Sequence, residues 1–485
     1  MLEELKNEAN LTHTENGAPA YRSTNSACLD LFAVCGALRQ AGEKEIIRKF
    51  MRAYTEDPDT AMRILFYARD IRGGLGERRF FQIIVRHLAD FRPASVTKNL
   101  PLFAEYGRYD DTLSLLGTKC EESLAKHIRS QLNVDLAAAD NGKSVSLIAK
   151  WLPSVNTSSP RTRQQAKQLC HLLGMKEKEY RRTLSALRKH IGIVEDHLRR
   201  RDYSFDYSQI PGKALFQYRR AMWHNDRTRY ENYLQKVHSG KAKMNTGTLY
   251  PYEIVRAAMY EHDPDILCSL DTAWNALQDF TDSRNALAVV DGSGSMYCDY
   301  GGGILPITVA VSLGLYFAER NRGHFANHFI TFSETPRLVK LKGNDIAAKV
   351  QHCMYYNEIA NTDLYEVFML ILITAVKNNL PQSELPELLY IISDMEFDMG
   401  VNPDKTVFED AKEKFEDYGY KLPQVIYWNV AARNEQYPVR MNEKGTALVS
   451  GASPMLFSHM MSHDLSPFTL MEQILNSDRY KKICA

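Results

Sequence analysis

Residues 286–296, ALAVVDGSGSM, join a short apolar run directly to a polar loop that contains two glycines. A continuous apolar run of this length is typical of a strand buried on both faces of a parallel sheet. The loop places the carboxylate of Asp291 and the hydroxyls of Ser293 and Ser295 on one side of a tight turn, because its glycines let the backbone bend round an ion. The stretch therefore predicts an α/β domain with a cation site at a strand end.

The sequence after residue 284 alternates between strand-length and helix-length runs. Strands are expected at 286–290, 328–332, 388–392, 424–428 and 446–450, and helices at 305–320, 362–378, 403–417 and 466–477. This alternation predicts a doubly wound, mostly parallel sheet with helices on both faces, in a domain that spans 285–485. Ligands of such sheets bind outside the carboxyl ends of the strands.

Two more oxygen donors stand at later loop positions. Thr362 opens the expected helix 362–378, and Asp394 follows the strand 388–392. With Asp291, Ser293 and Ser295 they make five oxygen ligands from three loops, a set that suits Mg²⁺ and leaves positions open for water or an incoming carboxylate. Mn²⁺ or Ca²⁺ would accept the same ligands. The alternative is a capped turn that binds no metal.

Residues 27–284 carry apolar side chains at helical spacing, interrupted by short polar breaks. Short helix pairs with short breaks predict an α-solenoid of the HEAT-repeat type. Residues 1–26 are left as an N-terminal arm. Within the helical domain we expect a helix over 177–200 that breaks near Gly192.

A glycine-rich string, Arg69 to Arg79, lies inside this helical domain but lacks the Lys-Ser/Thr of a phosphate-binding loop. Its glycines are expected to form a tight turn between two helices, with the arginines of the string paired to Asp70 and Glu77. A second irregular segment, 238–250, is expected to be an exposed basic loop.

The chain has 485 residues and a net charge of +1, but the charge is unevenly distributed. Residues 151–250 hold 20 basic and 8 acidic side chains, a local excess of 12 positive charges. Such density can bind a phosphate backbone by counterion release, although a solvated helical face is the alternative. The candidate nucleic-acid contacts are Arg161, Arg163, Lys167, Lys176, Arg181, Arg182, Arg188, Lys189, Lys241 and Lys243.

The composition excludes several classes of protein. Hydrophobic residues are 44% and charged residues 25%, which are ordinary values for a globular protein and not for a disordered or collagen-like chain. There is no apolar run of 18 residues for a transmembrane helix, and the charged N-terminus lacks the apolar segment of a secretory signal. Eight cysteines without a Cys-x-x-Cys spacing predict reduced thiols in a cytoplasmic protein. We expect a monomer that does not associate with membranes.

The loop residues resemble the metal-ion-dependent adhesion site of the von Willebrand factor A domain. By that resemblance Asp291, Ser293 and Ser295 form its first loop, Thr362 its second and Asp394 its third. The third loop departs from the pattern, because Ser393-Asp394-Met395 stands where many such domains have Thr-Asp-Gly. The aspartate is kept, so the resemblance still implies a metal site, on a stiffer loop.

A helical repeat module followed by such a domain resembles the Ro autoantigen (TROVE) family, and most closely a sister group of uncharacterised TROVE-like proteins. The strings similar to that group are RGGLGER at 72–78, YGRYDD at 106–111, KWLPS at 150–154, SDMEFD at 393–398 and WN at 428–429. In Ro proteins the helical repeats close into a ring whose ends the A domain joins. The hole takes single-stranded 3′ ends of misfolded RNA, and the basic outer face takes small structured RNAs.

Two functions follow as hypotheses. The first is a non-catalytic RNA-binding ring protein that holds structured or misfolded small RNA on a basic helical module and carries a Mg²⁺-binding A domain. The alternative is an adaptor without RNA, whose bound metal accepts the carboxylate of a protein partner. An enzyme is not expected, because the sequence has no His-Glu-x-x-His, Gly-x-Ser-x-Gly or Walker motif, and no convincing general base beside the metal ligands.

Overall fold

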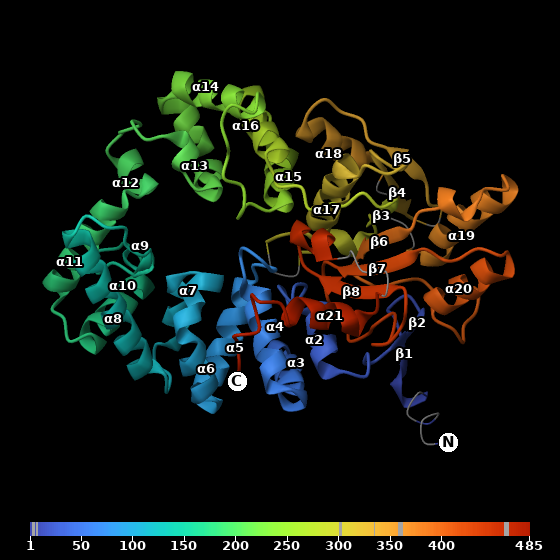
Figure 1. Ribbon diagram of the computed structural model, residues 1–485, viewed down its shortest axis with the longest axis horizontal. Helices are drawn as coiled ribbons and strands as arrows, with labels where there is room; N and C mark the ends of the chain where they lie inside the picture. Colours follow the sequence, from blue (N-terminus) through green and yellow to red (C-terminus); the bar gives the residue numbers. More distant parts are fainter. Residues whose placement is uncertain (2–4, 6–7, 300–302, 334, 357–361, 460–464) are drawn as a thin grey trace.

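The computed structural model describes residues 1–485 except 2–4, 6–7, 300–302, 334, 357–361 and 460–464. It consists of a small N-terminal hairpin, a long helical region, and a mostly parallel six-stranded sheet with its own helices. The sequence predicted this order of an α-helical part followed by an α/β part. Figure 1 shows the helical region as an arc whose two ends both reach the sheet domain.

The helices of the arc are mostly short and separated by short breaks. They are α2 (Ala27–Val34), α3 (Glu43–Glu56), α4 (Pro58–Arg69), α5 (Arg78–Phe91), α6 (Pro93–Asn99), α7 (Phe103–Tyr106), α8 (Glu121–Asp140), α9 (Ile148–Trp151), α10 (Pro160–Leu172), α11 (Glu177–Ile191), α12 (Val194–Arg199), α13 (Gly212–Asn225), α14 (Arg227–His238), α15 (Pro251–Tyr260) and α16 (Pro264–Asn275).

Local sequence explains where these helices begin and end. The side chain of Asp57 caps α4 by accepting hydrogen bonds from the backbone N–H groups of Asp59 and Thr60, and Pro58 supplies the fixed φ of a first helical residue. Gly192 ends α11 in the left-handed conformation, at φ 64°, which glycine adopts without a steric penalty. The expected break near this glycine is therefore confirmed, and α12 follows it.

The sheet contains all five expected strands. They are β3 (Ala286–Asp291), β4 (His328–Phe332), β6 (Leu388–Ser393), β7 (Gln424–Asn429) and β8 (Thr446–Ser450). The strand order is β5-β4-β3-β6-β7-β8, and every pair is parallel except β4 with β5 (Leu338–Lys340), a short edge strand that the sequence analysis missed. Parallel β3 and β6 are neighbours, so the loops after them meet at one edge of the sheet.

Helices cover both faces of this sheet (Figure 1). They are α17 (Pro306–Arg320), α18 (Ile346–Tyr355), α19 (Leu364–Lys377), α20 (Val407–Asp417) and α21 (Pro467–Leu475). Gly314 lets α17 approach the sheet closely, because a Cβ there would stand 2.4 Å from the Cγ2 of Val290. Among the described residues, no helix combines the length and apolar character needed to cross a bilayer.

The start of the arc packs on the far edge of the sheet. Helix α2 lies against β8, and the backbone N–H of Gly36 donates a hydrogen bond to the hydroxyl of Ser450 (3.0 Å). At the other end of the arc, α15 packs on α17 and α18. The guanidinium of Arg39 also lies 5.3 Å from the ring centroid of Tyr252, at the start of α15. The chain therefore closes on itself.

The glycine-rich string forms the expected turn between α4 and α5, but its pairing was predicted wrongly. Asp70 pairs with Arg479, from the segment after α21, and Glu77 pairs with Arg39. Two arginines of the string, Arg69 and Arg78, instead both bind Asp111. Each carboxylate of the string thus ties the turn to another part of the chain.

Candidate metal centre and basic helical surface

The predicted metal ligands of the first loop lie together at the end of β3. The buried carboxylate of Asp291 accepts hydrogen bonds from the backbone N–H of Ser293 at Oδ1 (2.9 Å) and from the hydroxyl of Ser393 at Oδ2 (2.6 Å). The hydroxyls of Ser293 and Ser295 are 3.1 Å apart. A short 3-10 turn that begins at Gly294 holds this arrangement.

Asp394 lies beside this group on the loop after β6. Its side chain is buried, and its Oδ2 lies 3.1 Å from the Nη2 of Arg433, as an ion pair without hydrogen-bond geometry. The next residue, Met395, takes a left-handed φ of 70°. A non-glycine residue in this conformation costs about 1–2 kcal/mol. The Oδ1 of Asp394 accepts a hydrogen bond from the backbone N–H of Glu396 (3.3 Å) on the same loop.

The electrostatics of this pair favour a cation. Burial, and then the neighbouring charge of Asp394, raise the pKa of the Asp291 carboxyl. Two buried carboxylates with hydroxyl oxygens beside them form a hard oxygen donor set, which fits Mg²⁺. No three Asp, Glu, His or Cys side chains cluster as metal ligands anywhere in the described part of the chain, so the hydroxyls are essential to any such site.

The hydroxyl of Thr362 is hydrogen-bonded to the segment that follows Asp394. It donates a hydrogen bond to the backbone carbonyl of Glu396 (2.7 Å) and accepts one from the Nδ2 of Asn16 (3.0 Å). The structure thus brings together Asp291, Ser293, Ser295 and Asp394, and it links Thr362 to them through the segment that follows Asp394.

The sequence analysis missed the residues of the N-terminal hairpin, which consists of β1 (Leu11–His13) and β2 (Pro19–Tyr21). The turn of this hairpin lies on the loop after β6. The hydroxyl of Thr14 donates to the carbonyl of Phe397 (2.6 Å), and the backbone N–H of Glu15 donates to Oε2 of Glu396 (2.7 Å). The carboxylate of Glu15 pairs with Arg433 (2.8 Å). No signal in one sequence could connect residue 15 with residue 433.

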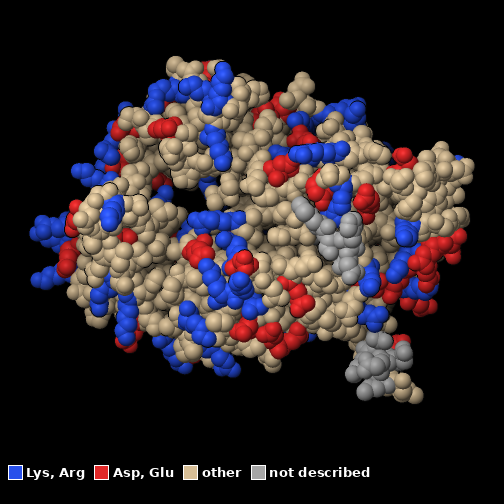
Figure 2. All heavy atoms as spheres, viewed as in Figure 1, with Lys and Arg blue, Asp and Glu red and all other residues tan. Residues whose placement is uncertain are grey.

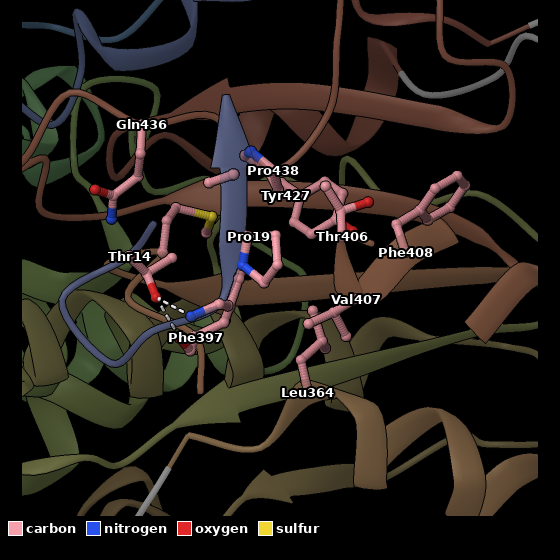
Figure 3. A pocket seen from close by; sticks show the side chains of 13 residues that line it. Thr14, Pro19, Leu364, Phe397, Thr406, Val407, Phe408, Tyr427, Gln436 and Pro438 are labelled. Atoms are coloured by element: carbon pink, nitrogen blue, oxygen red, sulfur yellow. Dashed lines mark hydrogen bonds between the residues drawn. The ribbon is translucent and has the colours of Figure 1, made fainter. Parts of the chain in front are cut away.

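The hairpin is anchored by an apolar bed on the sheet domain. Figure 3 shows β2 crossing over side chains from the loop after β6, from α19 and α20, and from β7. The buried side chains in this bed include Leu364, Phe397, Val407 and Tyr427. The space left between hairpin and bed is only about 10 Å³, room for about one water molecule. The hairpin is therefore packed as part of the sheet domain.

Most of the candidate RNA contacts lie on one exposed pair of helices. Arg161, Arg163 and Lys167 project from α10, which packs on α11. Lys176, Arg181, Arg182 and Lys189 lie on α11 or at its start, and all seven side chains are exposed. Figure 2 shows Lys and Arg gathered at this outer edge of the arc. We call these seven side chains the basic surface.

The other three candidates are placed differently. Arg188 is half-buried, and its guanidinium donates hydrogen bonds to the carbonyls of Ala149 (2.7 Å) and Leu152 (2.8 Å) and to the hydroxyl of Ser154 (2.7 Å). Arg188 thus holds the segment after α9 in place. Lys241 and Lys243 are exposed on the loop after α14, as expected, but the loop is exposed only in part, because Met244, Thr246 and Leu249 are buried. Lys243 also lines a groove of about 980 Å³ between this loop and the ends of α13 and α16.

Comparison with known proteins identifies a family. The model described as "Domain of unknown function (DUF2828)" matches residues 14–135 and 115–291, more than half of the chain. The chain belongs to this family. A second model, "Domain of unknown function (DUF7788)", matches residues 285–478, and with them the whole sheet and its loops.

Two individual proteins are similar to the chain. "Uncharacterized protein L728" of Acanthamoeba polyphaga mimivirus is 29% identical over 526 residues, covering 97% of this chain and 90% of the relative. Among solved structures, the Deinococcus radiodurans RO (RSR) protein aligns over 89% of this chain and 92% of its own, with 14% identity and a TM-score of 0.37.

Proposed function

We propose that this protein is a non-catalytic, cytoplasmic RNA-binding protein that holds small structured or single-stranded RNA on the basic surface of α10 and α11. The observation that supports this proposal is the exposure of seven Lys and Arg side chains on two packed helices. Only Lys167 has a carboxylate within ion-pair distance among the described residues, that of Glu177 at 3.6 Å. The remaining cations are available to phosphate groups.

The physics of such a surface favours backbone binding with little sequence readout. Arginine and lysine neutralise phosphates, and the counterions released from RNA supply the free energy of binding. The HEAT-like arc would present these cations along a curved outer face. The protein would then distinguish RNAs by their shape more than by their base sequence.

A gel-shift titration with single-stranded and hairpin RNA, repeated over a range of salt concentrations, tests the proposal. The charge reversal Arg181→Glu with Arg182→Glu should weaken RNA binding by at least about tenfold. It should also reduce the slope of log K against log salt concentration by the contribution of about two phosphate contacts. The matched control is Lys340→Glu with Lys342→Glu, two exposed lysines beside the edge strand β5. Equal loss in both variants, or no shift of either RNA by the wild-type protein at low salt, would contradict the proposal.

We further propose that the sheet belongs to the von Willebrand factor A type and that Asp291, Ser293, Ser295 and Asp394, with Thr362, hold Mg²⁺. The burial of two adjacent carboxylates supports this, because a divalent cation would neutralise charges that water does not reach. Bound Mg²⁺ would supply positive charge to an acidic ligand, as an adaptor function requires. Thermal unfolding with and without Mg²⁺ tests the site, and Asp291→Ala should abolish the stabilisation that Mg²⁺ gives.

A further inference from the structure

We propose that Glu15, at the turn of the N-terminal hairpin, is a built-in acidic ligand of the metal centre and takes the position that the carboxylate of an outside partner would need. This inference rests on the Mg²⁺ site proposed above. The hairpin would then supply a ligand to the metal, in addition to packing on the sheet domain.

Glu15 and Asp394 share the guanidinium of Arg433. Its Nη1 lies 2.8 Å from Oε2 of Glu15, and its Nη2 lies 3.1 Å from Oδ2 of Asp394. One guanidinium therefore holds the carboxylate of the hairpin beside the carboxylate of a proposed metal ligand. Carboxylate, hydroxyl and water oxygens are the ligands that Mg²⁺ and Mn²⁺ prefer, so Glu15 has the right chemistry for a coordination position.

The backbone of the hairpin turn is held by hydrogen bonds, whereas the Glu15 side chain is largely exposed. The backbone N–H of Glu15 is bound by Glu396, and Asn16 donates to the carbonyl of Glu396 (2.8 Å) as well as to Thr362. Glu396 is itself buried and accepts a second hydrogen bond from Asn434 (2.8 Å). The Glu15 side chain, by contrast, is 55% exposed and ends at Arg433 alone among the described residues. Its carboxylate can therefore turn without moving the hairpin.

The charges around Asp394 also favour Glu15 as a metal ligand. In the structure, Arg433 is the cation next to Asp394, and its side chain is only 19% exposed. A divalent cation beside Asp394 would repel this guanidinium and attract the Glu15 carboxylate at the same time. The Glu15 carboxylate would exchange its contact with Arg433 for one with the metal. No other residue is needed, because the carboxylates of Glu15 and Asp394 already lie beside the same guanidinium.

A Glu15 carboxylate on the metal would compete with any outside acidic partner. The hairpin is held by the backbone pairing of Tyr21 with Tyr437 (2.9 and 2.8 Å) and by the apolar bed of Figure 3. An outside acidic ligand would have to displace Glu15 from a turn that is tethered in this way. The metal centre would then fasten the hairpin to the sheet domain and exclude free carboxylates.

Mn²⁺ binding followed by water-proton relaxation tests the inference, since relaxivity per bound ion reports the number of water molecules on the metal. The variant Glu15→Gln keeps the backbone contacts and removes the charge. We expect it to bind Mn²⁺ more weakly and to show higher relaxivity per bound Mn²⁺, because water replaces the lost carboxylate. Glu8→Gln, an exposed carboxylate of the same terminal segment, is the matched control and should behave as the wild type.

Acetate provides the second measurement. It should lower the relaxivity of the Mn²⁺-loaded Glu15→Gln variant by replacing water, and should leave the wild-type protein unchanged. Equal relaxivity in wild type and Glu15→Gln, with Mn²⁺ bound in both, would overturn the role of Glu15 and leave the metal site standing. Absence of Mn²⁺ binding by the wild-type protein would overturn both proposals.

Discussion

Asp70 and Arg479 form an ion pair that joins positions 409 residues apart in the sequence. The Asp70 carboxylate is fully buried at the turn between α4 and α5, and it also accepts a hydrogen bond from the hydroxyl of Tyr480 (2.8 Å). Arg479 in turn lies over the ring of Tyr106, 5.0 Å from its centroid. The segment after α21 is thus fastened to the helical arc through a charge that water does not reach.

This pair should matter far more for stability than its exposed neighbour. Arg479→Met leaves the buried Asp70 carboxylate without its cation, so we expect a loss of about 3 kcal/mol in the free energy of unfolding, measured by urea denaturation. Lys482→Met is the matched control, because Lys482 pairs with Glu105 at a site where both side chains are more than 40% exposed. Its loss should stay below about 1 kcal/mol. Similar losses in the two variants would contradict the buried-charge argument.

The contact of α2 with β8 predicts a steric effect at Gly36. A Cβ at this position would stand 2.6 Å from the backbone carbonyl oxygen of Ser450, and backbone cannot move aside as a flexible side chain can. Gly36→Ala should therefore lower the midpoint of thermal unfolding. Gly247→Ala meets no atom within 4 Å and serves as the control, with an expected change near zero. An unchanged midpoint in Gly36→Ala would show that the helix can shift on the strand.

Arg188 and Lys189 are adjacent on α11, but their substitution should affect different properties. Arg188 should matter for stability, and Lys189 for RNA affinity. Arg188→Gln removes three hydrogen bonds to residues 149–154, and we expect a loss of about 1–3 kcal/mol in stability with little direct effect on RNA affinity. Lys189→Gln should weaken RNA binding by less than about tenfold and leave unfolding unchanged. Urea denaturation and gel-shift titration of both variants check this, and loss of RNA affinity at unchanged stability in Arg188→Gln would reverse the assignment.

The pH dependence of the free energy of unfolding should reflect the protonation of the Asp291 carboxyl. Burial, followed by the charge of Asp394, raises the pKa of this carboxyl from 3.8 to about 7. The folded state holds a proton that the unfolded chain releases, so the contribution of Asp291 to stability is complete below about pH 4 and is lost as the pH rises to about 7. In EDTA, wild type should therefore lose more stability over this window than Asp291→Asn, and Mg²⁺ should offset the loss. Parallel pH profiles of the two proteins would contradict this prediction.

The sequence predicted those features that depend on local pattern. Buried parallel strands are continuous apolar runs, and so 286–290 and 388–392 were placed almost to the residue. The edge strand β5 was missed because it is three residues long with only its middle residue, Val339, buried. The left-handed end of α11 at Gly192 was visible for the same local reason, since glycine has its own backbone preference.

Tertiary partners could not be predicted in the same way. The loop of Asp291 was found because its donors are neighbours in sequence, whereas Glu15 and Arg433 meet only after the hairpin has packed on the sheet. Asp70 was expected to pair within its own string because nearby arginines are the simplest partners, yet it pairs with Arg479. Arg188 has the same charge as Arg182, and only the fold determines that one is half-buried and the other exposed.

The packing of α2 on β8 has a consequence for biosynthesis. Gly36 and Ser450 are 414 residues apart, and seven of the eight residues of α2 are buried in the finished protein. At a synthesis rate of about 5–20 residues per second, this apolar helix leaves the ribosome roughly 20–80 s before the strand that covers it. During that interval the face of α2 that packs on β8 is open to chaperones and to other nascent chains, so slow translation should raise the demand of this protein for chaperone protection.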